Sequence, residues 1–173
     1  AGIGSTLRWK NLSFGFLIDV RYGGDVYLQS MMRLQSNGQT KETVAGREEY
    51  YTTGKGLISQ GVNVNTGLPN TVELDPTTYW GQFYGNIGNY IYDTTNVRLR
   101  ELNLTWTLPD KWFAKTIIRG LKLSAVANNV CFLYNNLPGF DPECTYSTGN
   151  GQGIETASLP STRSFGFNLN VTF

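Results

Sequence analysis

The chain ends in the stretch Phe165-Gly166-Phe167-Asn168-Leu169-Asn170-Val171-Thr172-Phe173, which alternates apolar and polar side chains without a break. Successive side chains of a β-strand point to opposite faces, so the aromatic and aliphatic residues form one row and Gly, Asn and Thr form the other. A soluble sheet can alternate in the same way, but a row of aromatic side chains rarely stands unprotected at a chain terminus. A strand that faces lipid on one side and water on the other accounts for this pattern.

Four earlier segments show the same alternation, so the sequence predicts five strands in all. They lie at about residues 3–9, 12–23, 95–108, 120–132 and 162–173. In the third and fourth of these segments the apolar residues change parity, near Arg100-Glu101 and near Asn128-Asn129. One extra residue at each point, a β-bulge, explains both changes.

The connections between these strands alternate between short and long. Lys10-Asn11 and residues 109–120 form the short connections, whereas residues 24–93 and 133–161 form the long ones. Antiparallel membrane barrels have short periplasmic turns and long extracellular loops, so the alternation predicts an orientation as well as a fold. The predicted fold is all-β: an antiparallel transmembrane β-barrel segment with extracellular loops at 24–93 and 133–161.

The first of these loops carries signals for short helices. Apolar residues recur at helix-like spacing from Tyr27 to Leu34, and Asp75-Pro76 resembles an N-cap followed by proline in the first helical turn. We therefore expect short helices within residues 24–93.

The composition excludes several classes of protein. Charged residues make up 16% of the chain and the net charge is +1, with Lys and Arg scattered along the sequence, so we expect no nucleic-acid partner. No segment approaches the roughly 20 apolar residues of a membrane-spanning helix. Ala1-Gly2-Ile3-Gly4 has no features of a secretory signal, so we expect a mature product or the tail of a longer chain.

No pattern typical of an enzyme is present. The chain has no His, no Gly-rich phosphate loop and no Cys-His metal spacing, so we expect no catalytic residue, no metal and no cofactor. Asp141-Pro142-Glu143 offers two carboxylates, but a turn in which Asp141 accepts backbone hydrogen bonds explains them better than a Ca²⁺ site does. Cys131 and Cys144 can form a disulfide or remain as two thiols, and the sequence does not distinguish these states.

Several motifs, taken in order, resemble the carboxy-terminal end of SusC/RagA-type TonB-dependent outer-membrane transporters. They are Arg21-Tyr22-Gly23-Gly24-Asp25-Val26-Tyr27, Asn89-Tyr90-Ile91-Tyr92-Asp93 followed by residues 97–104, Asn128-Asn129-Val130, Gly139-Phe140-Asp141-Pro142-Glu143 and the closing strand 167–173. The chain departs from the family pattern at Val130, at Cys144 and at Trp106-Thr107, without changing the parity of any strand.

This resemblance implies a barrel of about twenty-two strands, of which the chain supplies the last five. The plug domain and the TonB-contacting segment would lie upstream of Ala1. The resemblance further implies an outer-membrane location and the import of nutrients, either glycans and oligosaccharides or peptides. The implied partners are a SusD-like surface lipoprotein, the TonB complex through the missing N-terminal part, the barrel-assembly machinery and outer-membrane lipid. A passive or adhesive outer-membrane barrel and a secreted soluble β-sandwich that binds glycans are the alternatives.

Three sets of residues are candidates for specific roles. Loop aromatic residues either contact substrate or form the loop's own small core; they are Tyr79, Trp80, Phe83 and Tyr84. Charged strand residues are expected to face the lumen, because Arg at the lipid midplane would cost roughly 2–4 kcal/mol; they are Asp19, Arg21, Arg98, Arg100 and Glu101. These contact plug or substrate, or else form a salt-bridged wall. The terminal residues Phe165, Phe167 and Phe173 resemble an outer-membrane assembly signal.

Overall fold

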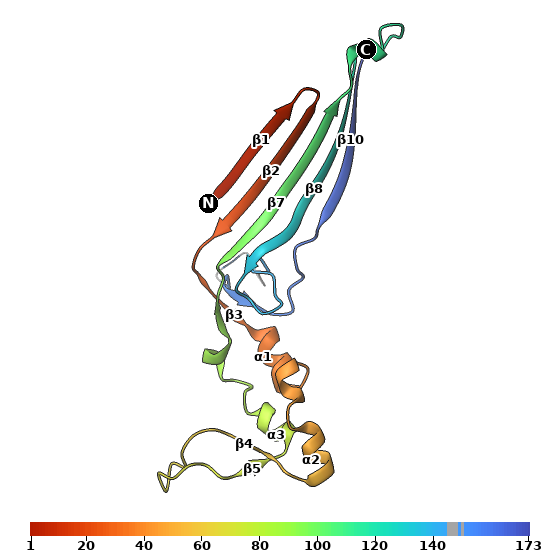
Figure 1. Cartoon of the computed structure of the whole chain (residues 1–173). Helices are drawn as coiled ribbons and strands as arrows, with labels where there is room; N and C mark the ends of the chain where they lie inside the picture. Colours follow the sequence, from red (N-terminus) through yellow and green to blue (C-terminus); the bar gives the residue numbers. More distant parts are fainter. Residues whose placement is uncertain (145–148, 150) are drawn as a thin grey trace. The chain divides into compact units, whose positions relative to one another are not determined.

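The computed structural model of the chain (Figure 1) describes residues 1–144, 149 and 151–173. The chain forms two compact units. The sheet unit comprises Ala1–Asp25, Asp93–Cys144 and Leu159–Phe173, and the loop unit comprises Val26–Tyr92 and Thr145–Ser158.

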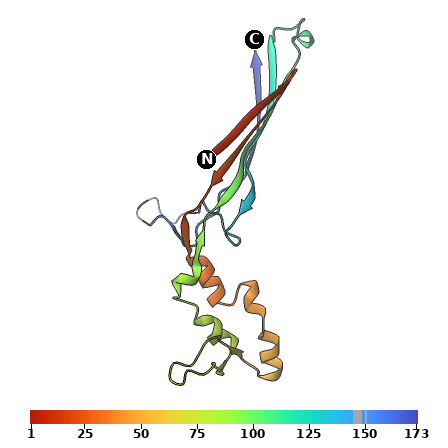
Figure 2. The same ribbon diagram turned by 60° about the vertical axis from the view of Figure 1, so that its left-hand side comes forward.

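The sheet unit is built on one five-stranded sheet in the order β1-β2-β7-β8-β10, in which all neighbouring strands are antiparallel. Its strands are β1 (Gly2–Trp9), β2 (Leu12–Arg21), β7 (Asn96–Thr107), β8 (Gly120–Asn135) and β10 (Ser164–Thr172). Figure 2 shows these strands as a single twisted layer. The predicted antiparallel sheet is confirmed, and β8 continues to Asn135, beyond the end predicted at residue 132.

Both predicted bulges are present, and they lie opposite each other. Leu99 and Glu101 of β7 pair with the adjacent residues Ile18 and Leu17 of β2, so Arg100 is the extra residue of β7. Leu99 also pairs with Cys131 and Glu101 with Asn128, so β8 has one extra residue opposite Arg100. The backbone of Asn129 is left-handed, with φ = 50°. Asn tolerates this conformation better than most residues do, because its short polar side chain can hydrogen-bond locally.

The bulges keep the apolar side chains on one face along the whole sheet. A row across all five strands contains Leu7, Phe14, Leu104, Ala125 and Phe167. The neighbouring row on the opposite face contains Thr6, Gly15, Asn103, Val126 and Gly166. In the isolated chain the apolar row is largely exposed, up to 88% for Phe167.

Connections of different length leave the two ends of the sheet (Figure 1). Lys10-Asn11 and residues 108–119, with the 3₁₀ turn η3 (Asp110–Trp112), lie at the turn end. Residues 22–95 and 136–163 leave the loop end. Within the part of the chain that is described, no helix is both long and apolar enough to cross a membrane.

The loop unit contains the predicted short helices. In chain order its elements are β3 (Asp25–Leu28), α1 (Gln29–Ser36), η1 (Lys41–Val44), α2 (Arg47–Thr53), β4 (Leu57–Ile58), β5 (Glu73–Leu74), α3 (Pro76–Gly81), η2 (Ile87–Tyr90), β6 (Ile91–Asp93) and β9 (Ile154–Glu155). Asp75 caps α3, and its Oδ1 accepts a hydrogen bond from the Thr78 amide at 3.0 Å, as the Asp75-Pro76 pair predicted. Leu28, Met32 and Tyr90 are buried and form part of the core.

One buried carboxylate ties distant parts of the loop unit together. Glu155 of β9 is 1% exposed, and Oε1 accepts a hydrogen bond from the Ser30 hydroxyl at 2.9 Å. Its other oxygen, Oε2, accepts one from the Ser30 amide at 3.3 Å. Because β9 also pairs in parallel with β3, the start of α1 is fixed by contacts more than 120 residues away in sequence.

Candidate functional site

The candidate site lies on the polar face of the sheet, at the loop end. Two arginines of β7, Arg98 and Arg100, meet three carboxylates there, those of Asp19, Asp141 and Glu143. We call these five residues the arginine network. Asp19 comes from β2, whereas Asp141 and Glu143 come from the connection that follows β8.

Arg98 occupies the centre of the network. Its Nη2 donates to Asp141 Oδ1 at 2.6 Å, and its Nη1 donates to Glu143 Oε2 at 2.9 Å and to Ser161 Oγ at 2.8 Å. The Arg98 side chain is only 2% exposed, and its guanidinium carbon lies 4.0 Å from the centre of the Phe132 ring. Such a desolvated arginine needs hydrogen-bonded partners, and the connection supplies them from residues 141–143 and from residue 161.

Arg100 joins the network because it is the bulge residue of β7. Its Nη2 donates to Asp19 Oδ2 at 2.7 Å and to Glu143 Oε1, and its Nη1 donates to Glu143 Oε2 at 2.9 Å. Asn129, on the opposite bulge, accepts a further hydrogen bond from Arg100 at 3.0 Å. The paired bulges therefore bring Arg100 to the same carboxylates as Arg98.

Asp141 also organises the turn predicted at Asp141-Pro142-Glu143. Its Oδ1 accepts from the Glu143 amide and its Oδ2 from the Ser161 amide, both at 3.0 Å, and the Ser161 hydroxyl donates to Oδ2 as well. The predicted turn is thus confirmed. The sequence did not predict that the same carboxylate pairs with Arg98.

Both carboxylates of this turn favour their charged form. Burial raises the pKa of Asp141, but hydrogen bonds from Arg98 and Ser161 outweigh burial and hold its pKa below the usual range. The pKa of Glu143 is lowered chiefly by the hydrogen bond from Arg100. The turn is therefore negatively charged at neutral pH and complements the two arginines.

A hollow of about 450 Å³ borders the network. Its lining includes Phe132, Phe140, Cys131 and Arg163 as well as Arg98. Among the described residues neither cysteine forms a disulfide, and the Cys144 thiol donates to the Leu159 carbonyl at 3.3 Å. The described residues also contain no cluster of three or more His, Cys, Asp or Glu side chains that could hold a metal.

The charged strand residues singled out from the sequence divide into two groups. Asp19, Arg98 and Arg100 belong to the network. Arg21 and Glu101 lie on the same face by register, but their side chains make no ion pair within the described part of the chain. All five therefore share one polar face.

The sequence alone did not predict Asp141, Glu143 and Ser161 as partners of these arginines. They lie more than 40 residues away in the sequence, in a connection without regular periodicity. The one available signal was the coincidence of two closely spaced arginines in a predicted strand with two closely spaced carboxylates in a predicted turn.

A second candidate site is the aromatic cluster of the loop unit. The rings of Tyr79, Trp80 and Phe83 contact one another, with centroids 5.1 to 5.7 Å apart. Trp80 also borders a cavity of about 390 Å³ that Arg47 helps to line, and its buried Nε1 has no hydrogen-bond partner among the described residues. Tyr84 is 58% exposed and makes no ring contact with the other three residues. The geometry accommodates both a loop core and a ligand contact at Trp80.

The three terminal phenylalanines lie on or next to β10. Phe165 and Phe167 are on the apolar face and are 70% and 88% exposed. Phe173 follows the last residue of the strand and is 71% exposed.

Comparison with known proteins identifies relatives that match nearly the whole chain. It is 25% identical to TonB-dependent receptor P3 and 24% identical to TonB-dependent receptor P26, both of Formosa agariphila, over 99% of its length. The chain spans 16% of the length of each of these relatives. No protein-family model matches the chain.

Solved structures lead to the same group of proteins. The chain superposes on the RagAB peptide importer in its closed-closed state with a TM-score of 0.65 and 18% identity, covering 99% of this chain and 16% of that one. For the open-open state the TM-score is 0.64, again at 18% identity, covering 99% and 17% of the two chains. The fold is that of a segment of these transporters, and the resemblance to SusC/RagA-type TonB-dependent receptors predicted from the motifs is confirmed.

Proposed function

We propose that this chain forms the final strands and two extracellular loops of a TonB-dependent transporter that imports nutrients across the outer membrane. The observation that carries the proposal is the match of almost the entire chain to TonB-dependent receptors, combined with a single-layered sheet that exposes one apolar face. An antiparallel sheet of this kind is the building unit of a transmembrane barrel, where lipid covers the apolar face.

In this arrangement the polar face of the sheet lines the lumen. The register of β2 and β7 supports this orientation, because Asp19, Arg98 and Glu101 share the face opposite the apolar row. The arginine network then fixes the base of the connection between β8 and β10 to the inside of the wall. Its role is to hold Asp141 and Glu143 of this connection against the polar face of the sheet.

The proposed transporter works with several partners. A SusD-like surface lipoprotein would cover the extracellular loops, and the TonB complex would act through a segment of the protein outside this chain. The barrel-assembly machinery would recognise the terminal strand through Phe165, Phe167 and Phe173. The proposed substrates are glycans and oligosaccharides or peptides; likeness to a peptide importer supports the peptides.

Two alternative functions make different demands on the structure. A passive or adhesive outer-membrane barrel has the same wall but needs no energy from TonB. A secreted soluble β-sandwich needs a second sheet packed against the apolar face. The five-stranded sheet of the sheet unit is a single layer with an exposed apolar face, which favours a barrel wall over a sandwich.

Energy dependence of uptake tests the proposal. Cells that produce the full-length protein and cells that lack it are given fluorescent peptides and fluorescent oligosaccharides, with and without a protonophore. Active import predicts uptake that requires the protein and stops with the protonophore. Uptake that persists with the protonophore would indicate a passive barrel, and recovery of the protein in the aqueous fraction without detergent would indicate a soluble protein.

The aromatic loop residues are tested separately. We propose that Trp80 and Tyr84 contact substrate, with Tyr79 and Phe83 supporting Trp80. The variants Trp80→Ala and Tyr84→Ala are compared for their affinity for the fluorescent peptides and oligosaccharides. They are also compared for hydrogen exchange of residues 76–83. Weaker binding of Tyr84→Ala with unchanged exchange supports the contact, because Tyr84 lies outside the ring cluster. Unchanged binding in both variants, with faster exchange in Trp80→Ala, leaves only a structural role for the cluster.

A further inference from the structure

The charges of the chain are distributed unevenly between the two ends of the sheet. Residues 8–13 and 105–122 contain six of the fourteen Lys and Arg residues but only one of the thirteen acidic residues, Asp110. The remainder of the chain therefore carries more acidic than basic residues. The net charge of +1 does not reveal this asymmetry, because it sums over the whole chain. The topology places both segments at the turn end, so the basic residues gather there.

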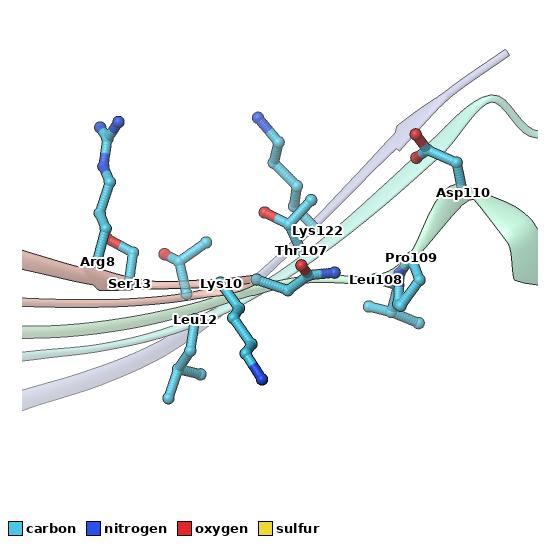
Figure 3. A pocket seen from close by; sticks show the side chains of 11 residues that line it. Arg8, Lys10, Leu12, Ser13, Thr107, Leu108, Pro109, Asp110 and Lys122 are labelled. Carbon is cyan, nitrogen blue, oxygen red and sulfur yellow. The ribbon is translucent and has the colours of Figure 1, made fainter.

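Basic side chains at the turn end point to both sides of the sheet. Figure 3 shows Arg8 and Lys122 projecting on the same side as Ser13 and Thr107, whereas Lys10 projects on the other side. A hollow of about 600 Å³ lies among these residues. Lys111, Lys115 and Arg119 are exposed on the connection between β7 and β8.

Tryptophans accompany these basic residues on the apolar side. Trp106 of β7 and Trp112 of η3 meet edge to face, with centroids 6.0 Å apart, so the connection folds back towards the apolar face of the sheet. Trp9 is 70% exposed, and the Lys10 ammonium lies 5.2 Å from its ring centre. Ile117 in the same connection is 80% exposed. We call residues 9–11 and 108–119 the turn rim.

We propose that the turn rim binds the headgroups of anionic phospholipids in the leaflet next to the short turns. Trp side chains prefer the boundary between hydrocarbon and water, and clustered Lys and Arg residues attract anionic headgroups at that depth. The turn rim combines both features in two short connections. This inference rests on the proposed placement of the sheet in a membrane. It further specifies which lipids the protein binds and in which leaflet they lie.

The choice of a lipid follows from the position of the charges. Lys10, Lys111 and Lys115 lie in the turns beside the exposed tryptophans, where the lipid headgroups of a barrel membrane are found. A protein partner that bound only Arg8 and Lys122 on the polar face would leave these three lysines and the tryptophans without a role. An anionic lipid contacts both the lysines and the rings.

The experiment uses the full-length protein reconstituted into phosphatidylcholine bilayers. Spin-labelled phosphatidylglycerol and spin-labelled phosphatidylcholine are compared by electron paramagnetic resonance, which measures the fraction of each lipid immobilised by the protein. The rim variant combines Lys10→Gln, Lys111→Gln and Lys115→Gln. The matched control combines Arg33→Gln, Lys41→Gln and Lys55→Gln, which removes the same number of charges from exposed sites of the loop unit.

We expect the wild-type protein to immobilise phosphatidylglycerol in preference to phosphatidylcholine. The rim variant should lose most of this preference, whereas the control variant should keep it. Raising the salt from about 0.05 M to about 0.5 M should weaken the preference in the wild-type protein, because exposed charges are screened. A difference in gel mobility between heated and unheated samples verifies that both variants are folded.

Two results would overturn the inference. Absence of any preference for phosphatidylglycerol, or an equal preference in the rim variant, would show that the rim does not select this lipid. The proposed function fails in a different way, because a protein outside the membrane would immobilise neither lipid.

Discussion

Arg98 illustrates how a charged residue can be accommodated in the wall of the sheet. Its guanidinium makes hydrogen bonds to two carboxylates and a hydroxyl and lies against the Phe132 ring. Removing two ions from water is expensive, so a buried pair of this kind is weak support for overall stability. Its value lies in specificity, since Arg98 holds Asp141, Glu143 and Ser161 of the connection that follows β8 by hydrogen bonds of defined geometry.

Arg98→Met should release this connection from the sheet. The substitution leaves Asp141, which is 8% exposed, without its main counter-ion, and breaking a buried pair costs about 3–5 kcal/mol. Amide exchange of residues 136–144 in the full-length protein should accelerate about a hundredfold or more. Arg21→Met is the control, because Arg21 shares the face but makes no ion pair among the described residues. Equal protection in both variants would contradict the role assigned to the network.

The same connection should respond to acid but not to changes around neutral pH. The pKa values of Asp141 and Glu143 are lowered in the folded chain, so their stabilisation is complete above their ordinary values of 3.8 and 4.5. It is lost as the pH falls through the lowered values. Exchange protection of residues 136–144, corrected for intrinsic rates, should stay constant from about pH 8 to about pH 5 and fall below about pH 4.

Asp141→Asn provides the control for this pH dependence. The variant should show weaker protection at neutral pH and a smaller further loss in acid, because one of the two titrating groups is gone. A transition of the wild-type protein near neutral pH would contradict the assignment, because the lowered pKa values keep both carboxylates charged there.

At the scale of single elements, the paired bulges of β7 and β8 determine which residues reach the network. Asn129 has φ = 50°, and its side chain accepts from Arg100 and donates to the Thr162 carbonyl at 3.1 Å. One residue thus combines a left-handed backbone with contacts to two neighbouring segments. The neighbouring Asn128 pairs regularly with Ser164 and has no such backbone.

Comparing Gly with Ala at Asn128 and at Asn129 isolates the contribution of the backbone conformation to stability. Asn129→Ala should be less stable than Asn129→Gly by about 1–2 kcal/mol, because both remove the amide but only Ala is strained at positive φ. At Asn128 the order should reverse, because Gly weakens a regular strand. Unfolding of the full-length protein in guanidinium, followed by tryptophan fluorescence, measures all four variants. The same order at both positions would contradict a bulge at Asn129.

The terminal strand leads to a prediction about assembly. Removal of Phe173 should reduce the amount of folded protein in the outer membrane, because the proposed assembly signal ends on this aromatic residue. Phe113→Ala, in the connection between β7 and β8, is the control for loss of one aromatic side chain. Immunoblots of heat-modified and unmodified outer-membrane protein measure the folded fraction. Equal amounts of folded protein from the deletion and the control would contradict a role of Phe173 in the assembly signal.

The sequence predicted those elements whose side chains repeat with a fixed period. The parity changes in β7 and β8 located both bulges, and Asp75-Pro76 located the start of α3. It did not predict α2 or the parallel pair of β3 and β9, because elements of two to seven residues are too short for a period to be recognised. The arginine network depends on contacts between distant segments, which no local pattern encodes.

At the scale of the whole chain, the sheet unit has an open edge on each side. Among the described residues, β1 and β10 each pair with one neighbour only, and the apolar face is exposed. Unpaired strand edges and exposed apolar rows both promote association with other chains. In the proposed barrel, further strands would pair with these edges and lipid would cover the apolar face.

Residues 1–173 produced alone should consequently aggregate in water. We expect the segment to sediment without detergent, and to remain dispersed only in detergent or denaturant. Replacing Leu7, Leu104 and Phe167 by Ser in the same segment should increase the soluble fraction, because these residues lie in one exposed apolar row. A monodisperse wild-type segment in plain buffer, measured by light scattering, would favour the sandwich alternative.

The opposed bulges have a further consequence for how neighbouring strands find each other. Sliding a strand by two residues leaves every side chain on its original face, so alternation alone accepts many wrong alignments. A slide of that size between β7 and β8 would separate Arg100 from Asn129 and place the left-handed residue opposite a regular pair. This irregular point, one of two register shifts between β7 and β8, therefore distinguishes the observed alignment of the strands from alignments shifted by two residues.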